Sequence, residues 1–282
     1  MTKVQPLSQL RLASHVRACA CKEQIVLLDL RRSRYLSLGA SGARALSQRV
    51  IGWPSMEALN QLDATQPVDT TDRDQASTAA LGAALRRLLE LDLLTDVDEE
   101  AMSGPAEEAS APISLPQACR CLESEADFCE PRIRATDALR SLHAAVQAHW
   151  WLRKLSLERI AARVDARRGG AKAERATNSR TGLAGHRSGG GAGSEISSDA
   201  ASLHIAALKF ERLRPFALTA RDQCLRDSLA LMSFLASMGL RARWIIGVRT
   251  RPFGAHSWVQ IGDLVLNDHH EHVRAYQPIL VV

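Results

Sequence analysis

Three residues near the C-terminal end of the sequence have the side chains that acyl-transfer chemistry needs. Cys224, His256 and Asp268 stand in that order. A thiol nucleophile, an imidazole base and a carboxylate that orients the imidazole are the parts of a cysteine-dependent acyl-transfer site. The alternative is that the Cys fills a helix core and the His is an ordinary, satisfied polar group. The choice depends on whether the chain brings the three side chains together.

The residues around Cys224 predict that its thiol lies in the first turn of a helix. Asp222 can cap this helix, apolar residues recur at helical spacing over 225–238, and Gly239 can end it. Unpaired N–H groups and the positive end of the helix dipole favour a thiolate and help to hold an oxyanion. The backbone N–H of Cys224 is the expected oxyanion donor, and the side-chain amide of Gln223 is a second candidate.

Three runs of β-type residues follow the helix, at 242–248, 256–261 and 264–268. If the last two form a hairpin with a three-residue loop, His256 lies directly opposite Asp268. A two-residue loop would put the two side chains on opposite faces. We therefore predict an odd-length loop, with Gly262 at a position of positive φ.

A family resemblance covers about residues 205–282. This region is similar to the leader peptidases, or B proteins, of lasso-peptide biosynthesis in the motifs RDQCLRDSLAL, GLRARWIIGVRTRPFGAHSWVQ, VLND and the terminal PILVV. These proteins belong to the transglutaminase-like branch of papain-type cysteine enzymes. The resemblance implies that Cys224 is the nucleophile, His256 the base and Asp268 the third member of a triad.

The resemblance also implies a function. It indicates a cysteine protease that removes the leader from a ribosomally synthesised lasso-peptide precursor. An asparagine-synthetase-like cyclase partner would then close the freed core into a macrolactam. ATP would serve that partner and the coupled maturation, and no cofactor would bind this chain directly. Two alternatives stay open: another acyl-transfer enzyme on the same triad, such as a transglutaminase or amide-forming transferase, and a non-enzymatic peptide escort.

The N-terminal third predicts three strands followed by three helices. The strands fall within 16–38, and helical patterns follow at 41–51, 55–62 and 76–94. The motifs YLSLGASGARAL and LLELDLLTD resemble the PqqD-like domain, a winged helix-turn-helix relative that binds precursor leaders. A DNA-binding winged helix is disfavoured, because ALGAALRR has too few basic and amide side chains to read a groove.

This second resemblance implies a place for the leader. The leader would add as a further strand to the edge of 34–38 and pack against the helix over 78–89. The candidate contact residues are Arg34, Tyr35, Leu36, Leu85 and Leu88. The alternative for the tyrosine and the three leucines is that they fill the core.

The order of segments predicts an α+β protein. We expect the leader-recognition domain at 1–95, a flexible linker at 96–130 and the peptidase domain at 131–282. The linker is rich in Asp, Glu, Ala, Ser and Pro without a sustained apolar period, which is typical of a tether. Such a tether would keep a bound leader near the protease at high effective concentration.

Within the predicted peptidase domain, helical patterns alternate with a segment of different composition. The helices are expected at 131–148, 150–167 and 201–213, the last of them ended by Pro215. Gly, Ser, Arg and Ala dominate 168–199, which we expect to be a disordered insertion.

Composition narrows the class of protein. The chain has 282 residues and 46% hydrophobic content, enough to bury ordinary cores. Charges interrupt every apolar stretch of the N-terminal MTKVQPLSQLRLASHVRACA, and the sequence has no run of 18 apolar residues, so we expect no signal peptide, no membrane partner and a cytoplasmic location. The net charge of +5 comes with only 4% aromatic residues and scattered cations, which disfavours nucleic acid as a partner.

Neither cysteines nor histidines indicate a metal site. The six cysteines are expected to be reduced thiols. The C-x-C pairs that begin at Cys19 and Cys119 have narrower spacing than usual zinc ligands and lie far apart in the sequence. Adjacent His residues in 269–272 point in different directions, so we expect a solvated rim there and no bound metal.

Overall fold

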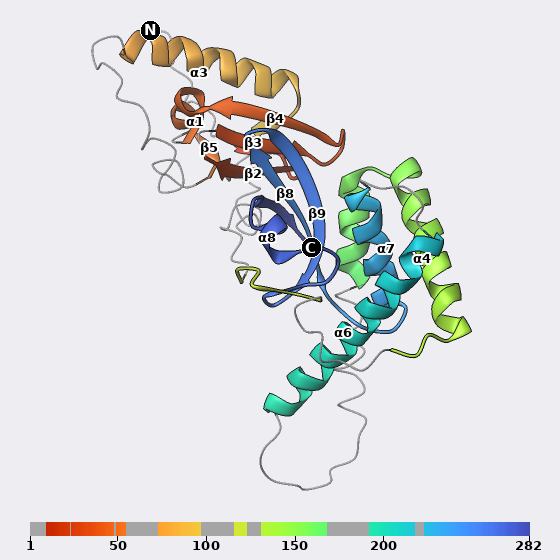
Figure 1. Ribbon diagram of the computed structural model, residues 1–282. Coiled ribbons are helices and arrows are strands. Elements are labelled where there is room, and N and C mark those ends of the chain that lie inside the picture. Colours follow the sequence, from red (N-terminus) through yellow and green to blue (C-terminus); the bar gives the residue numbers. More distant parts are fainter. Residues whose placement is uncertain are drawn as a thin grey trace, which may run out of the picture. The chain divides into compact units, whose positions relative to one another are not determined.

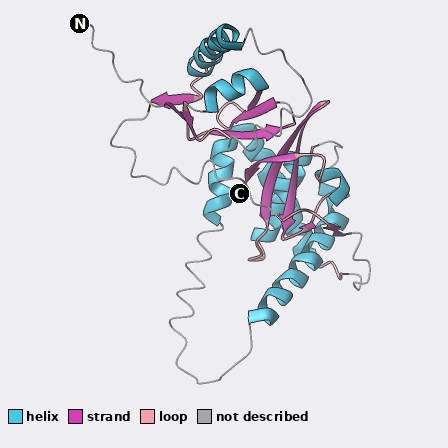
Figure 2. Cartoon of the chain, turned by 90° about the vertical axis from the view of Figure 1, so that its left-hand side faces the viewer, coloured by secondary structure: helices cyan, strands magenta, loops and turns pink. Residues whose placement is uncertain are grey.

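The structure is a computed structural model that describes most of the chain. The described residues are 10–22, 24–47, 49–54, 73–96, 116–122, 131–167, 192–217 and 223–282. Contacts divide the chain into two compact units, and both combine helices with strands (Figure 2). The N-terminal unit comprises 1–114 together with 248–254 and 277–279, and the C-terminal unit comprises the rest.

Three antiparallel strands form the larger sheet of the N-terminal unit. They are β2 (Val16–Cys21), β3 (Gln24–Asp29) and β4 (Arg34–Gly39), in the order β2-β3-β4. The prediction of three strands within 16–38 is therefore confirmed, and β4 extends one residue further. Because β3 is central, β4 lies at an edge of this sheet.

Two helices and a small second sheet complete the N-terminal unit. Helix α1 (Ala40–Ser47) contacts β3 and β4, and α3 (Arg73–Glu90) packs against α1. The second sheet has the order β5 (Val50–Ile51), β1 (Leu10–Leu12), β6 (Leu94–Asp96). The core between these elements includes the buried side chains of Leu27, Leu46, Trp53 and Leu88.

The helix ends differ from those predicted. The expected helix over 41–51 stops at Ser47, because the next residues form β5. The expected helix over 76–94 stops at Glu90. There Asp92 has a φ of 57°, and the N–H of Leu93 donates to the carbonyl of Leu88 at 2.9 Å, which closes the helix. The expected helix over 55–62 lies outside the described residues, and the winged helix-turn-helix relationship stays a prediction.

A five-stranded sheet forms the centre of the C-terminal unit, apart from its residues within 248–254 and 277–279, which are grouped with the N-terminal unit. Its order is β11 (Gln277–Val281), β8 (Arg243–Thr250), β9 (Phe253–Ile261), β10 (Leu264–Val265), β7 (Arg120–Cys121). The predicted strands at 242–248 and 256–261 are confirmed as β8 and β9. Strand β10 is shorter than predicted, and this has consequences for the site.

Strand β7 corrects the predicted linker over 96–130. It pairs in parallel with β10, and Ala118 just before it is buried in the core around Trp258. Arg120 forms an ion pair with Asp263 at 2.7 Å, which holds this strand to the β9–β10 loop. Residues 116–122 are therefore part of the C-terminal sheet, and sequence pattern missed them because the strand is only two residues long.

Helices pack together beside this sheet (Figure 1). Helix α7 (Cys224–Ala236) contacts both α4 (Ala135–Lys154) and α6 (Ala192–Ala217). The rings of Phe210 and Phe234 lie 5.5 Å apart between α6 and α7. A further helical segment spans 157–167, and a short helix α8 (His270–Val273) precedes β11.

Three helix predictions in this unit need correction. Helix α4 continues through the expected break near 149 and ends at Lys154, because its buried face extends to Trp151. Helix α6 begins at Ala192, so the expected disordered insertion over 168–199 ends earlier, and 168–191 lie outside the described residues. Pro215 does not end α6, which continues for two residues beyond it. Within the described part of the chain, no helix has the length and apolarity needed to cross a bilayer.

Candidate functional site

Cys224 is the first residue of α7 and so lies in the first turn of the helix, as predicted. Gln223 occupies the N-cap position without a capping bond from its side chain, and the predicted cap Asp222 lies outside the described residues. The sulfur of Cys224 accepts hydrogen bonds from the backbone N–H groups of Leu225 and Ser257. Donors from a helix and a strand therefore converge on the thiol, and both favour its ionised form.

His256 lies on β9 between Cys224 and Asp268. Its Nε2 is hydrogen bonded to Oδ2 of Asp268, and the ring is also hydrogen bonded to the Cys224 thiol. Aromatic neighbours restrict the ring: the centroid of Tyr276 lies 5.1 Å away, and Trp258 stacks on it at 6.1 Å. The structure thus brings together the three residues that the sequence singled out.

The hairpin that carries them does not have the predicted loop. Ile261 pairs with Leu264, so the loop contains only Gly262 and Asp263. Gly262 does have the predicted positive φ, 54°. Continued in this register, the hairpin would point the side chain of Asp268 away from His256. The prediction of an odd-length loop is therefore wrong.

Asn267 explains how Asp268 still reaches His256. The N–H of Leu266 donates to the carbonyl of Val259 at 2.9 Å, but the N–H of Val259 donates to the side-chain Oδ1 of Asn267 at 2.8 Å. A side chain thus replaces a backbone ladder bond, and β10 ends at Val265. The backbone leaves the ladder at this point, and strand alternation no longer determines the direction of Asp268.

Asp268 is held by more than His256. Its Oδ1 accepts a hydrogen bond from the backbone N–H of His269 at 2.7 Å. The Nδ1 of His272, on α8, lies 3.0 Å from Oδ2 of Asp268, and its ring centroid lies 4.7 Å from that of His256. His272 is exposed, as expected for a solvated rim, and one turn of helix also points it back at Asp268.

The three groups shift one another's pKa values. Burial by itself raises the pKa of the Cys224 thiol, but His256 and the two backbone N–H groups lower it below its usual value. Burial likewise lowers the pKa of His256, but its bonds to Asp268 and Cys224 outweigh this and raise the pKa to about 9. Burial raises the pKa of Asp268, and its hydrogen bonds to His256, His269 and His272 lower it to about 2. Near neutral pH His256 is therefore an imidazolium and Asp268 a carboxylate, and the lowered pKa of Cys224 favours its thiolate form.

A cavity of about 540 Å³ opens onto the thiol. Arg214 of α6 and the buried Asp227 of α7 form part of its wall, with Nη2 and Oδ2 2.6 Å apart. This pair ties α6 to the first turn of α7, close to Cys224. The cavity has the size of a small-molecule or side-chain site, which suits an acyl group held against the nucleophile.

Comparison with known proteins matches this unit to a family. The sequence pattern described as the Transglutaminase-like superfamily covers residues 138–281, just over half of the chain. The chain belongs to the transglutaminase-like superfamily. It is also 48% identical over 48 residues to the microcin J25-processing protein McjB of Escherichia coli. That match covers 17% of this chain and 23% of the relative, so the chain spans about a quarter of the relative's length. No solved structure matches.

The predicted leader-contact residues lie outside the segment that matches the transglutaminase-like superfamily. Arg34 is exposed, and Tyr35, Leu36 and Leu85 are half-buried. Leu88 is 0% exposed, so it belongs to the core and cannot line a surface groove. The helical spacing of Leu85 and Leu88 did not reveal which of them faces inward, since α1 covers only one side of α3.

Metal ligation in this transglutaminase-like site has one candidate group among the described residues. Ligand atoms of His256, Asp268 and His272 lie within 4.8 Å of one another. Asp268 is already hydrogen bonded to both His256 and His272, and these bonds account for the closeness of the three groups. Sequence reasoning missed His272 and Asn267 as parts of the site, and the only signal was their closeness to Asp268 along the chain.

Proposed function

We propose that this member of the transglutaminase-like superfamily is a cysteine peptidase that removes the leader from a ribosomally synthesised lasso-peptide precursor. The observation that carries the proposal is the hydrogen-bonded chain from Cys224, at the N-terminus of α7, through His256 to Asp268. The local similarity to a microcin-processing protein supports a precursor peptide as the substrate.

The chemistry follows from the ionised pair. The Cys224 thiolate attacks the carbonyl at the junction of leader and core, and backbone N–H groups at the start of α7 stabilise the oxyanion. The His256 imidazolium donates its proton to the departing core amine, which leaves the leader as a thioester. His256 then takes a proton from water, and the resulting hydroxide attacks the thioester, which releases the leader acid and restores the Cys224 thiolate beside the His256 imidazolium. Asp268 holds the imidazole throughout.

The N-terminal unit supplies leader recognition in this proposal. An extended leader adds to the edge strand β4, beside Arg34 and Tyr35, and its apolar side chains contact Leu36 and Leu85. The core then passes to an asparagine-synthetase-like cyclase, which uses ATP to close the macrolactam. In this proposal the predicted linker over 96–130, apart from residues 116–122 that the structure places beside the C-terminal sheet, tethers the bound leader to the peptidase.

The decisive experiment compares the wild-type chain with Cys224→Ala on the precursor peptide, in the presence of the cyclase. We expect the variant to leave the leader attached, as measured by mass spectrometry. Cys119→Ala is the matched control, because Cys119 is an exposed thiol outside the triad. Normal cleavage by Cys224→Ala would refute the assignment. Transfer of the leader to an added amine, with no free leader acid, would show a transferase instead.

A further inference from the structure

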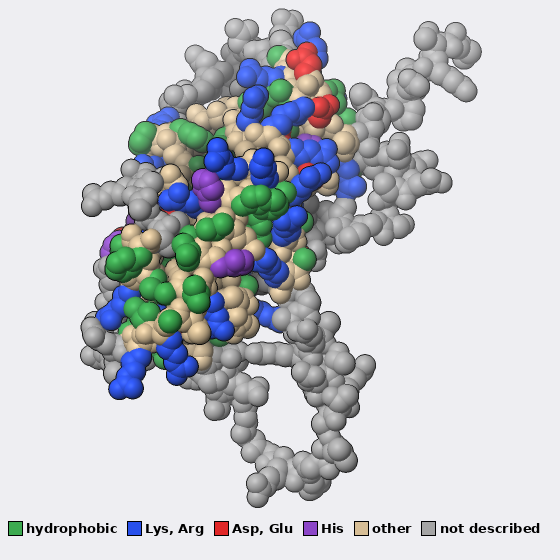
Figure 3. Space-filling model, turned by 90° about the vertical axis from the view of Figure 1, so that its right-hand side faces the viewer, with side chains coloured by type: hydrophobic (Ala, Val, Ile, Leu, Met, Phe, Trp, Pro, Cys, Tyr) green, Lys and Arg blue, Asp and Glu red, His purple; other side chains and the backbone are tan. Residues whose placement is uncertain are grey.

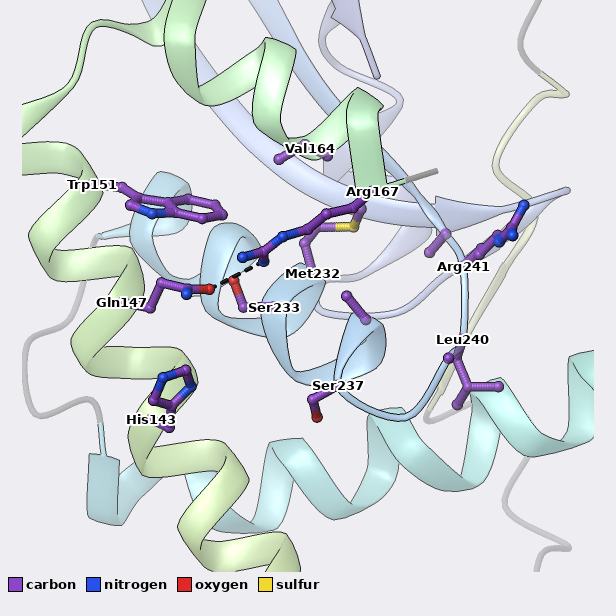
Figure 4. Close-up of a pocket in the computed structure, with 13 residues that line it drawn as sticks. His143, Gln147, Trp151, Val164, Arg167, Met232, Ser233, Ser237, Leu240 and Arg241 are labelled. Carbon is purple, nitrogen blue, oxygen red and sulfur yellow. Dashed lines mark hydrogen bonds between the residues drawn. The ribbon is translucent and has the colours of Figure 1, made fainter. Parts of the chain in front are cut away.

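A second cavity lies at the opposite end of α7 from Cys224. It has a volume of about 480 Å³ and is bounded by α4, the helical segment 157–167 and the end of α7 (Figure 4). Ser233, in its wall, lies nine residues after Cys224, about 13 Å along the helix axis. The cavity shares no residue with the one that opens onto the thiol, so it has no part in the proposed cleavage.

The cavity combines an apolar wall with a cation that lacks an acidic partner there. Trp151, Val164 and Met232 supply buried apolar surface. Arg167 lies over the ring of Trp151 at 4.9 Å and donates a hydrogen bond to Oε1 of Gln147 at 3.1 Å (Figure 4). None of the residues that line this cavity, within the described ranges, is Asp or Glu.

Arg167 is exposed, and its guanidinium has the like charge of Arg163 as a neighbour. Burial lowers the pKa of its guanidinium, and the charge of Arg163, one helical turn earlier, lowers it further. Cations four residues apart on a helix repel each other. An anion bound to Arg167 would offset the repulsion from Arg163, because guanidinium groups bind carboxylates strongly.

A buried hydroxyl without a partner points to the same place. Ser233 is 7% exposed, and its Oγ has no hydrogen-bond partner. In Figure 4 this hydroxyl faces the pair formed by Arg167 and Gln147. A buried polar atom without a hydrogen-bond partner costs free energy. A ligand oxygen that accepts a hydrogen bond from the Ser233 hydroxyl would therefore recover that free energy on binding.

We propose that this cavity binds a carboxylate attached to an apolar group. The carboxylate pairs with Arg167 and accepts a hydrogen bond from Ser233, while the apolar group packs against Trp151 and Met232. The apolar acid is either a free acid or the C-terminal residue of a peptide, since both have the same chemistry at this site.

Of the two candidate ligands, the surface next to the cavity favours a peptide over a free acid. Apolar side chains at helical spacing are exposed along α4: Leu139, Leu142, Val146 and Trp150. The last two border a hollow that shares Arg167 and Trp151 with the cavity. Apolar and basic side chains lie together over much of the face shown in Figure 3. A chain leaving the cavity can therefore cover this stripe.

The test uses the full chain and calorimetric titration with four probes. These are 4-phenylbutyrate, its amide, a tripeptide that ends in phenylalanine with a free carboxylate, and the same tripeptide as an amide. We expect both acids to bind saturably and both amides to bind at least about tenfold more weakly. Equal binding of acids and amides, or no saturable binding of either acid, would overturn the proposal. Inorganic phosphate that competes as well as 4-phenylbutyrate would show a general anion site and would also overturn it.

Variants locate the binding. Arg167→Gln should weaken both acids about tenfold, while Arg159→Gln, an exposed arginine of the same helix outside the cavity, should leave them unchanged. Equal losses in the two variants would contradict the site. Ser233→Ala should weaken the acids yet raise the melting temperature of the free protein, because it removes an unpaired buried hydroxyl. If the natural ligand is a peptide, Val146→Asn should weaken binding of the tripeptide acid and leave binding of 4-phenylbutyrate unchanged. If both acids bind this variant as they bind the wild type, the natural ligand is a free acid.

Discussion

The side chain of Asn267 donates a hydrogen bond from Nδ2 to Oγ of Ser228, at 3.1 Å. Ser228 lies one helical turn after Cys224, and the other end of the same amide accepts the N–H of Val259 on the strand of His256. The side chain of Asn267, the residue before Asp268, therefore connects the helix that carries Cys224 to the strand that carries His256.

We expect Asn267→Ala to reduce cleavage of the precursor by about tenfold to a hundredfold, because small displacements of reacting groups cost that much. Ser228→Ala should reduce cleavage less than Asn267→Ala does. In the double variant, the losses of stability should show a coupling of about 1 kcal/mol, measured by denaturant unfolding. Additive losses in the double variant would mean that the hydrogen bond between them does not matter.

Alkylation of Cys224 by iodoacetamide tests the ion pair without any peptide substrate. The thiolate is the reactive form, and His256 lowers the pKa of the thiol. We expect His256→Ala to shift the alkylation profile of Cys224 to higher pH, as followed by mass spectrometry of the labelled peptide. Cys19 is an internal control, since burial and the neighbouring Cys21 raise its pKa to about 12 and should keep it unlabelled. An unchanged profile for Cys224 would argue against the pair.

The pH dependence of cleavage should be bell-shaped. Activity rises as the Cys224 thiol ionises and falls as the His256 imidazolium loses its proton, near its pKa of about 9. Asp268→Asn removes the charge that supports the imidazolium, so the alkaline limb should move to lower pH. An alkaline limb that stays in place would show that another group controls it.

The same shifts predict the sign of the effect on stability. The pKa of His256 is raised in the folded state. Its contribution to the free energy of unfolding is therefore complete below about pH 6.5 and is lost as the pH rises through about 9. The pKa of Asp268 is lowered, so its contribution is present above about 3.9 and is lost as pH falls through about 2. Thermal melts of wild type and His256→Ala should therefore converge toward high pH. Parallel melting curves would contradict this.

His272 should act as a positioning residue through Asp268. We expect His272→Ala to lower kcat several-fold with little change in KM, because substrate binding does not need this side chain. His272→Asn keeps a donor near the carboxylate and should recover part of the loss. A purely structural role would lower the melting temperature in both variants without moving the pH profile of kcat.

Gly247 should tolerate no side chain. A Cβ at this position of β8 would lie 2.8 Å from the ring of Trp258 and 2.9 Å from Cβ of Tyr276, the two aromatic neighbours of His256. We expect Gly247→Ala to destabilise the fold by about 1–3 kcal/mol and to reduce cleavage. Gly82→Ala is the matched control, because its Cβ would meet nothing within 4 Å and helix propensity predicts a gain of up to about 1 kcal/mol. Equal melting temperatures for the two variants would contradict the packing argument.

Local sequence patterns were sufficient for the elements that depend on near neighbours. Strands β2 to β4, β8 and β9 follow from residue alternation and turn residues, and the apolar period indicated a helix with Cys224 in its first turn. The candidate triad also follows from residue types and a family resemblance. These features need no knowledge of what packs against them.

The tertiary structure decided the rest, because it depends on partners distant in the sequence. The hairpin has a two-residue loop, yet Asp268 still reaches His256, because Asn267 bonds to Val259 and Ser228 and ends the ladder that strand alternation assumed. Strand β7 is too short to have a pattern and exists only through its pairing with β10. Residue types alone could propose Cys224, His256 and Asp268. Their direction toward one another is set by where a strand stops, and hydrogen bonds across the fold determine that.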